Sequence, residues 1–344
     1  MRLGIIGRGI AALATAQEAH AKGWHVTLHG PVRGDGDASY AAHGFSIHKG
    51  LLITQSDFFR AKMAGQRLLW DWLEETERAS GAALPRVKGL WEPYWTADDF
   101  TRVAARVYRR AFTGCFRMDH RPAPSEWAGL FRTLPLGTFY YSDDFWFDPR
   151  PFLDVIEARL IAGGVTILDP IVTSLGRSGA QWSVGTGMYD CVVIAAGAGT
   201  NRLLAHSNFP LLAMKSVLAA VVETRHKTVA TPLAFTRFGG GAVIGPASRL
   251  PHEAASAALF PFAEQSFVGE GRIVHGTRMR TRDKSPFVGP IDDAALKGLY
   301  VLTGLGRNGM ELARGAARNL VDQIRTGQPE ASRLPLNPEG KRKK

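Results

Sequence analysis

Two glycines close to the N-terminus have the spacing of a phosphate-binding turn. Gly7 and Gly9 open the pattern Gly-x-Gly-x-x-Ala, which Ala12 completes. In such a turn the first glycine permits a tight bend, the second lets a pyrophosphate approach the backbone, and the small third residue lets helix and strand pack closely. Arg8 and Ile10 stand between these positions, and free N–H groups at the helix start would bind phosphate oxygens. The indicated chemistry is the binding of a dinucleotide cofactor.

The elements that would position this turn lie on both sides of it. Residues 3–6 are a short apolar run typical of a buried strand, and residues 25–29 predict a second strand. The alanine-rich residues 13–22 predict a helix whose Leu13 faces the sheet. Strand, glycine turn, helix and strand make the dinucleotide-binding βαβ unit. Its second strand normally ends in an acidic residue that binds the ribose. His29 stands there, and a neutral imidazole accepts only one such hydrogen bond.

A second glycine-rich turn lies near the other end of the chain. Residues 298–303 predict a strand, and residues 304–310 (Gly-Leu-Gly-Arg-Asn-Gly-Met) predict a turn. Residues 311–326 predict a helix, and its apolar face carries Leu312, Ala316, Leu320 and Ile324. An ordinary turn at a sheet edge would look the same. Two such units so far apart nevertheless favour one extended cofactor touched by both ends of the chain, as in FAD proteins.

The overall composition limits the classes to which this protein can belong. The 344 residues are 45% hydrophobic and 21% charged, which is ample for a packed core and suggests two domains. No stretch approaches the roughly 20 apolar residues of a membrane span. Because a strand begins at once, we expect no signal peptide and a cytoplasmic protein. Cys115 and Cys191 alone cannot complete a structural metal site, so we expect no metal and two reduced, buried thiols.

The chain is strongly basic, with a net charge of +11. A cluster at helical spacing is formed by Arg102, Arg106, Arg109 and Arg110, with Arg117 and Arg121 close behind. Residues 331–344 predict a basic tail that ends Lys-Arg-Lys-Lys. Such charge attracts polyanions but does not by itself identify a nucleic-acid binder. The cluster is either an ordinary exposed helix face or a surface for RNA.

The middle of the chain predicts further elements. Residues 56–77 read as a long helix, residues 82–141 as irregular, and residues 152–162 as a helix capped by Asp148. Strands are expected at 165–168, 171–175, 181–184 and 190–194, the last running into a glycine turn at 197–199. Short strands at 218–223, 231–238 and 241–244 suit a separate antiparallel sheet.

Taken in order, these motifs resemble the D-amino-acid oxidase superfamily of FAD proteins, to which glycine oxidase and sarcosine oxidase belong. The resemblance runs from residue 2 to about residue 328. It implies an α/β fold, with a Rossmann-like FAD-binding domain and an inserted α+β substrate domain. The expected FAD-binding domain is 1–85, 145–215 and 271–330, and the expected substrate domain is 86–144 and 216–270.

The resemblance also implies which residues hold the cofactor. They are Gly7, Arg8, Gly9, Ile10, Ala12, His29, Ser39, Ala42, His43, Gly44, Val172, Gly197, Gly306, Arg307, Asn308, Gly309 and Met310. Val172 would contribute its backbone on the adenine side. The position at which sarcosine oxidase carries its flavin-linking cysteine falls near Gly276, so we expect FAD to be bound non-covalently.

For catalysis, the resemblance implies oxidation of a C–N bond by hydride transfer to flavin N5, which gives an imine that hydrolyses. In the family segment that residues 276–289 resemble, the arginine two places after the glycine grips a substrate carboxylate. That residue is Arg278 here, and a guanidinium matches a carboxylate bidentately. The alternative is that Arg278 is one basic residue on a solvated strand. His48 could assist amine deprotonation and His43 could lie near the flavin, although a structural role is open for both.

Residues 281–289 have the pattern Thr-Arg-Asp-x-x-Pro-x-Val-Gly, which indicates an alternative activity. The pattern resembles the FAD domain of the bacterial tRNA 5-methylaminomethyl-2-thiouridine biosynthesis protein. That branch removes the carboxymethyl group from 5-carboxymethylaminomethyluridine at the wobble position. The basic cluster at residues 102–110 would then follow the tRNA backbone.

A third hypothesis is an FAD-binding module without turnover. His29 allows it, and so does the lack of a clear match for the tyrosine of glycine oxidase-type sites, near which Phe235 and Phe238 stand. Candidate aromatic walls of the active site are Tyr140, Tyr141 and Trp146.

Overall fold

The computed structural model describes most of the chain. The described residues are 1–34, 36–47, 57–111, 118–123, 125–127, 130–131, 133–225, 233–237, 240–245, 271–282, 285–291 and 293–327. Within some of these helices and strands only the backbone is described, namely at 57–59, 106–111, 118–119, 126, 218–225, 233–237, 240–245, 271–274 and 294. In the described part, no helix is both long and apolar enough to cross a membrane.

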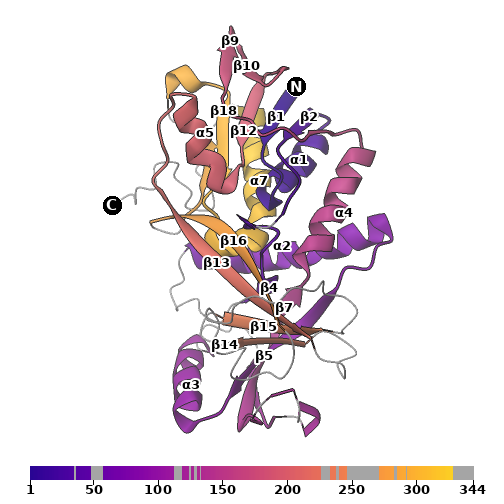
Figure 1. Ribbon diagram of the computed structural model, residues 1–344, viewed down its shortest axis with the longest axis vertical. Helices are drawn as coiled ribbons and strands as arrows, with labels where there is room; N and C mark the ends of the chain where they lie inside the picture. The colour runs from indigo at the N-terminus through magenta and orange to yellow at the C-terminus, as the bar shows by residue number, and fades with distance from the viewer. Residues whose placement is uncertain are drawn as a thin grey trace.

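A six-stranded sheet forms the upper half of the molecule (Figure 1). Its order is β17 (Phe287–Pro290), β18 (Leu299–Thr303), β12 (Cys191–Ile194), β1 (Arg2–Ile6), β2 (His25–His29) and β8 (Thr166–Leu168). All neighbours run parallel except β17, which is antiparallel to β18. Three distant stretches of sequence therefore build one sheet, as the α/β prediction requires. The expected strand 25–29 matches β2 residue for residue.

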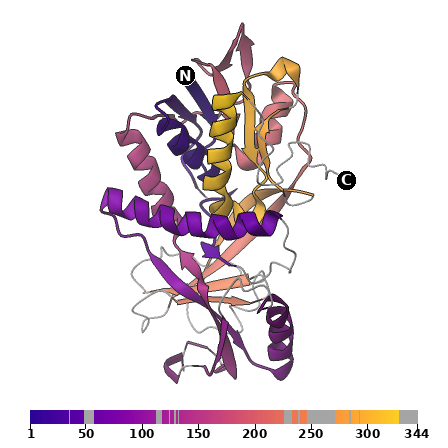
Figure 2. The ribbon, with the colours of Figure 1, turned by 180° about the vertical axis from the view of Figure 1, so that it is seen from behind.

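Three helices lie against one face of this sheet, and a fourth, α2 (Asp57–Ser80), crosses below them (Figure 2). The three are α1 (Ile10–His20), α4 (Pro149–Ala162) and α7 (Gly309–Thr326). Helix α1 starts three residues earlier than expected because Gly9 caps it directly. Asp148 caps α4 as predicted, since its carboxylate accepts the N–H of Arg150 at 3.1 Å. The predicted apolar face of α7 is buried throughout.

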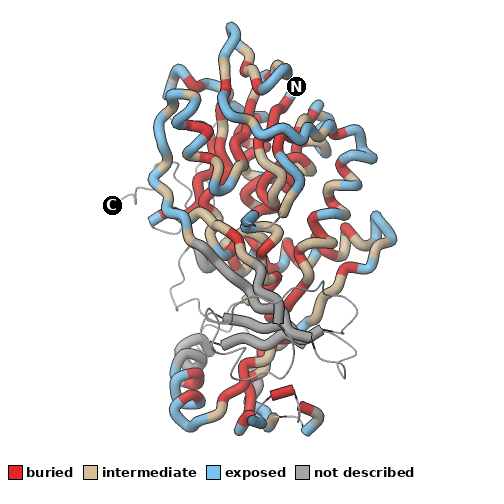
Figure 3. Tube along the Cα trace, viewed as in Figure 1, coloured by how far each residue is buried: buried red, intermediate tan, exposed pale blue. Residues whose placement is uncertain are grey.

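Helices α2 and α7 meet at a close backbone contact, where α2 crosses below α7 in Figure 2. A Cβ atom at Gly65 would lie 2.4 Å from the carbonyl oxygen of Glu311. No other residue type fits there without moving one of the helices. This contact fixes the start of α7 against α2, and Figure 3 shows many buried residues along the helices and strands of the upper half.

A nine-stranded sheet occupies the middle and lower half (Figure 1). Its path is β3 (Gly36–Asp37), β16 (Gly271–Thr281), β13 (Met214–Arg225), β15 (Gly240–Gly245), β14 (Leu233–Arg237), β5 (Arg86–Tyr94), β7 (Gly137–Phe147) and β4 (Phe45–Ser46), with β6 (Met118–Arg121) beside β7. The expectation of an antiparallel sheet is confirmed in part, since β14–β15, β13–β16 and β5–β7 are antiparallel. The pairs β13–β15, β14–β5 and β16–β3 are parallel, so the sheet is mixed.

Two other expectations from the sequence are wrong. Residues 82–141 are not irregular, because they hold β5, α3 (Ala97–Ala111), β6 and the first part of β7. In β5, Gly89 has φ +90° and the pairing with β7 shifts between Lys88 and Leu90, so the alternation that signals a strand is broken. Residues 171–175 form no strand, and the short strands β9 (Gly176–Ser178), β10 (Gln181–Val184) and β11 (Gly187–Tyr189) make a separate sheet beside them.

The division into an FAD-binding domain and a substrate domain stays a proposal. By sheet membership, residues 271–281 belong with the nine-stranded sheet, since β16 pairs with β13 along its whole length. Helix α3 lies at the end of the molecule far from α1 (Figure 1).

Candidate cofactor and substrate site

A cavity of about 940 Å³ lies where the two sheets meet. One wall consists of the residues that follow the carboxyl ends of β1, β2, β12 and β18, where open parallel sheets bind their ligands. The opposite wall is residues 276–279 of β16. A volume of this size suits a cofactor or another large organic ligand.

Most of the predicted site residues line this cavity. They are Gly7, Arg8, Gly9, Ile10, His29, Ser39, Ala42, His43, Gly44, Val172, Gly197, Arg278, Gly306, Arg307, Gly309 and Met310. Ala12 and Asn308 do not line it. Both are buried, and Ala12 has no exposed surface, as expected for a residue that packs helix against strand. His48 lies outside the described residues.

The glycine turn has the geometry of a phosphate cradle. Gly7 has φ +128°, and a Cβ atom there would lie 2.3 Å from the carbonyl oxygen of Ala195. At the start of α1, the hydroxyl of Ser39 accepts the N–H of Ile10 at 3.0 Å. A Cβ atom at Gly9 would lie 2.9 Å from that same hydroxyl oxygen. The turn therefore admits only glycine at residue 7, and Ser39 holds the adjoining loop close to the helix start.

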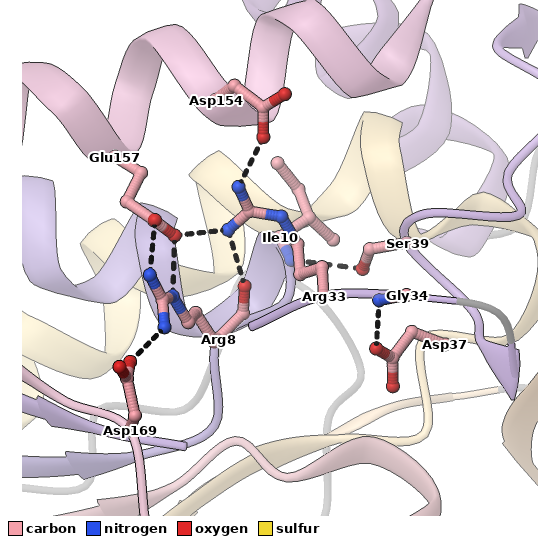
Figure 4. A network of polar contacts seen from close by, with 9 residues as sticks. All are labelled: Arg8, Ile10, Arg33, Gly34, Asp37, Ser39, Asp154, Glu157 and Asp169. Atoms are coloured by element: carbon pink, nitrogen blue, oxygen red, sulfur yellow. Dashed lines mark hydrogen bonds and ion pairs between the residues drawn. The ribbon is translucent and has the colours of Figure 1, made fainter. Parts of the chain in front are cut away.

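Two arginines and one carboxylate bind this turn to α4 (Figure 4). Arg8 pairs bidentately with Glu157, with Nε–Oε2 and Nη2–Oε1 distances of 2.8 and 2.6 Å. Arg33 also pairs with Glu157 and donates to the carbonyl oxygen of Arg8 at 3.1 Å. The outer carboxylates of Asp154 and Asp169 contact Arg33 and Arg8, at 2.6 and 2.5 Å. Burial opposes ionisation of Glu157, yet the two arginines lower its pKa overall.

His29 is more constrained than the sequence indicated. It lines the cavity at the end of β2, but its Nε2 lies 2.7 Å from the hydroxyl oxygen of Tyr189, and the two rings meet edge to face. Burial lowers the pKa of His29, which favours the neutral ring. Only Nδ1 is left for a ribose hydroxyl. Tyr189 is missing from the sequence prediction because no local pattern links it to a residue 160 positions away.

At the other end of the cavity, His43 is a neutral hydrogen-bond donor. Its Nδ1 accepts the N–H of Phe45 at 2.9 Å, which places the ring proton on Nε2. The indole of Trp146 donates to its carbonyl oxygen at 3.0 Å. Burial, followed by the charges of Arg278, Lys62 and Arg307, lowers the pKa of His43 to about 4.

Arg278 lies on β16 opposite Val217 of β13, half-buried against the cavity. Burial lowers its pKa, and the neighbouring charges of Arg307 and Arg280 act in the same direction. Arg307 lines the same end from the 3-10 helix η5 (Gly306–Asn308). Among the described residues, neither guanidinium has a hydrogen bond or ion pair. Both are therefore available to an anionic ligand.

A buried carboxylate that the sequence prediction missed also lines this end. Glu311, at the start of α7, accepts the hydroxyl of Ser46 at 2.7 Å and lies 3.4 Å from the ammonium of Lys62 on α2. Burial raises the pKa of Glu311, although Lys62 and Ser46 act in the opposite direction. No sequence spacing joins these three residues, because they meet only where α2 and α7 cross.

The expected aromatic walls are wrong for the described side chains. Tyr140, Tyr141 and Trp146 do not line the cavity. Tyr141 is buried against Glu92, with 2.5 Å between the two oxygens, and Tyr140 stacks under Arg121. The side chains of Phe235 and Phe238 lie outside the described part. Among described residues, no group of three or more His, Cys, Asp or Glu side chains could hold a metal ion.

Comparison with protein families decides the class. A family model described as FAD dependent oxidoreductase matches residues 2–323. The chain belongs to this family of FAD-dependent oxidoreductases. It is therefore a flavoprotein oxidoreductase of the D-amino-acid oxidase superfamily, as the motifs indicated.

The fold agrees with solved members of this superfamily. Glycine oxidase from Geobacillus kaustophilus superposes with a TM-score of 0.71 over 96% of both chains, at 19% identity. Iminodiacetate oxidase from Chelativorans sp. BNC1 gives a TM-score of 0.71 over 95% of this chain and 96% of its own, at 17% identity.

Two curated relatives are similar in sequence. The tRNA 5-methylaminomethyl-2-thiouridine biosynthesis bifunctional protein MnmC of Azoarcus sp. (strain BH72) is 25% identical over 96% of this chain and 57% of its own length. A D-amino acid dehydrogenase of Rhodopseudomonas palustris (strain HaA2) is 33% identical over 33% of this chain and 27% of its own. The chain thus spans about half, or less, of the relatives it matches.

The residues present fit FAD. The cradle at Gly7 and the start of α1 suits a pyrophosphate, and Val172, His29 and Arg278 line the same cavity. Gly276 also faces the cavity, where a Cβ atom would lie 2.7 Å from that of Ala41. A cysteine at residue 276 would have no room.

Proposed function

We propose that this protein oxidises the C–N bond of an amino acid or a glycine-like secondary amine. The observation that carries the proposal is Arg278, a half-buried guanidinium that lines the cavity and has no ion pair in the described part of the chain. An unpaired guanidinium in such a place suits a substrate carboxylate, which it binds through two parallel hydrogen bonds. A carboxylate held there fixes the neighbouring amine carbon.

Bound FAD would supply the hydride acceptor, its N5 atom. The chain's own residues would bind, orient and desolvate the amine. His43 is not a base for this reaction, because its Nδ1 is occupied by the N–H of Phe45 and its Nε2 carries the proton. It would donate one hydrogen bond from Nε2. The candidate for amine deprotonation is then His48, which lies outside the described residues, unless the amine arrives neutral.

We also propose that FAD is held without a covalent bond. The packing of Gly276 against Ala41 supports this, since it leaves no space for a linking side chain. Cys191 supports it too, because this thiol lies outside the cavity lining and burial raises its pKa to about 11. A thiol with so high a pKa is a poor nucleophile.

Substitution of Arg278 tests the proposed role. Arg278→Leu should weaken binding of N-methylglycine to the FAD-loaded protein at least tenfold, because a charge-assisted hydrogen bond contributes about 1.5–3 kcal/mol. Arg278→Lys should recover part of that affinity. Arg280→Leu is the matched control, since Arg280 is on the same strand but does not line the cavity. Equal losses in the 278 and 280 leucine variants would contradict a direct contact.

A second candidate activity is removal of a carboxymethyl group from a modified wobble uridine in tRNA. It is favoured by the similarity to MnmC, which covers 96% of this chain. Its substrate also carries a glycine unit, so Arg278 would keep its role. Arg102 on α3 is exposed and paired with Asp99 at 2.7 Å, and the side chains of Arg106, Arg109 and Arg110 lie outside the described part. Gel-shift titration with total tRNA at two salt concentrations tests it, because phosphate contacts weaken steeply with salt.

A third candidate is an FAD-binding module without turnover. It is based on His29, whose Nε2 is occupied by Tyr189, so that only Nδ1 remains for a ribose hydroxyl. A protein that binds FAD yet is never reduced by amines would support this role.

A further inference from the structure

The substrate end of the cavity holds more positive charge than one carboxylate requires. Arg278 on β16 and Arg307 on η5 both line the cavity. The two elements adjoin where Arg280 forms a β-bridge with Leu305. Arg278 is half-buried, whereas Arg307 is exposed. Within the described ranges neither is paired. Arg280 adds a third charge close enough to act on Arg278.

The carboxylates that line the cavity do not offset this charge. Glu311 is already engaged by Lys62 and Ser46. Asp37 lies on β3 and accepts the N–H of Gly34 at 2.9 Å. His43 is neutral and adds a donor rather than an acceptor. Repulsion between the half-buried guanidinium of Arg278 and the exposed guanidinium of Arg307 is relieved when anions bind to them.

We infer that the substrate is an amine with two carboxylates, one bound by Arg278 beside the carbon that is oxidised and the other bound by Arg307. This inference rests on the proposed amine oxidation. For iminodiacetate, a hydride would leave one methylene carbon for bound FAD and a proton would leave the nitrogen. One water would then hydrolyse the C=N bond to glyoxylate and glycine. An amino acid with a carboxylate in its side chain belongs to the same class.

Two other uses of Arg307 are distinguishable. Both arginines could share one carboxylate, or Arg307 could favour negative charge on reduced FAD. In the first case a second carboxylate gains nothing. In the second, loss of Arg307 changes reduction by every substrate to the same degree. Only a second carboxylate subsite makes the effect of Arg307 depend on the number of carboxylates.

The test is a set of matched ligands on the FAD-loaded protein. Malonate and acetate are non-oxidisable probes, and their dissociation constants follow from perturbation of the flavin absorption spectrum. Iminodiacetate with N-methylglycine, and D-aspartate with D-alanine, are the oxidisable pairs. We expect about tenfold tighter binding of malonate than of acetate, the gain from one charge-assisted hydrogen bond of about 1.5 kcal/mol. The same preference should appear in kcat/KM.

Variants assign the preference to a residue. Arg307→Leu should reduce the malonate-to-acetate ratio to near one, Arg307→Lys should retain part of it, and Arg278→Leu should weaken both ligands. Arg280→Leu should keep the ratio, because this residue does not line the cavity. A wild-type ratio near one would overturn the inference without any variant. Equal effects of Arg307→Leu on both ligands would also overturn it.

Failure of this inference is separable from failure of the proposed function. Reduction by N-methylglycine without any preference for iminodiacetate would leave amine oxidation standing and remove the second subsite. If no amine reduces the flavin, the malonate and acetate constants still decide whether two carboxylates are bound.

Discussion

Lys62 and Glu311 form an almost fully buried ion pair beside the cavity, with 3.4 Å between Nζ and Oε2 and side chains that are 6% and 4% exposed. The pair joins α2 to α7 at the crossing where Gly65 lets the helices touch. Because the Glu311 carboxylate is paired with Lys62, it does not neutralise the charges of Arg278 and Arg307. A buried pair of this kind is costly to break from one side, because the remaining charge is unpaired.

Substitution of Glu311 and substitution of Lys62 should lower the free energy of unfolding by different amounts. Glu311→Gln leaves the Lys62 ammonium without its counter-charge and should cost about 3–5 kcal/mol in the free energy of unfolding. Lys62→Met should cost less at acidic pH, because the pKa of Glu311 is already raised by burial and the acid can stay neutral. As pH rises through that pKa, the Lys62→Met variant should lose stability. Urea unfolding between pH 5 and 8 measures both, and equal, pH-independent losses would contradict the pairing.

His43 should make stability fall in acid. Its pKa is lowered to about 4 in the fold, against 6.5 for a free histidine, so the unfolded chain binds more protons between these values. Stability should rise with pH across this window, and the loss on going down to pH 4 should be about 3 kcal/mol. His43→Asn keeps an acceptor for the N–H of Phe45 and does not titrate. A slope between pH 4 and 6.5 that is unchanged in His43→Asn would rule out His43 as its source.

The contact of Glu157 with Arg8 and Arg33 should support cofactor binding. Glu157→Gln leaves both guanidinium groups, which are 11% and 7% exposed, without their shared charge. Fluorescence titration of the apoprotein should show FAD affinity reduced about tenfold or more, since hydrogen bonds to charged groups contribute about 1.5–3 kcal/mol. Asp154→Asn is the matched control, because Asp154 is 70% exposed and should change affinity little. Similar affinities for wild type and Glu157→Gln would show that the network does not hold the turn.

Gly276→Cys should disrupt the site rather than create a covalent flavin. The new Cβ would lie 2.7 Å from that of Ala41 and 3.0 Å from the carbonyl oxygen of Asp37. The loop 37–41 must then move, and FAD affinity should fall, with Gly276→Ala showing most of the loss. In-gel flavin fluorescence after denaturation detects any covalent product. A fluorescent band for Gly276→Cys together with unchanged FAD affinity would contradict this prediction, because it would show that the loop 37–41 moves at little cost.

The sequence alone predicted those parts of the fold and of the site that are determined by a local pattern of residues. The glycine turn at residues 7–12, the strand 25–29 and the buried face of α7 could all be read because spacing along the chain determines them. Arg278 could be named because it stands at a fixed offset from Gly276 in a recognisable segment. These residues line one cavity even though they are far apart in the chain.

Residue pairs created by tertiary contacts could not be read in this way. The hydroxyl of Tyr189 is hydrogen-bonded to His29, 160 residues away in the chain, and Glu311 is hydrogen-bonded to Ser46, 265 residues away. The strands of residues 82–141 were hidden by Gly89 and the register shift it accompanies. The aromatic residues expected as cavity walls serve instead as packing and as hydrogen-bond donors, because Tyr141 and Trp146 face Glu92 and His43.

Anaerobic reduction of the purified, FAD-loaded protein tests amine oxidation most directly. Glycine, N-methylglycine and iminodiacetate would be added in turn, followed by total tRNA, while the flavin absorption is recorded. We predict bleaching by free amines, with glyoxylate formed in an amount equal to the flavin reduced, and loss of this bleaching at low amine concentration in Arg278→Leu. Bleaching only by tRNA that carries the carboxymethylaminomethyl group would contradict the small-molecule assignment. A flavin that no amine and no tRNA reduces would contradict turnover altogether.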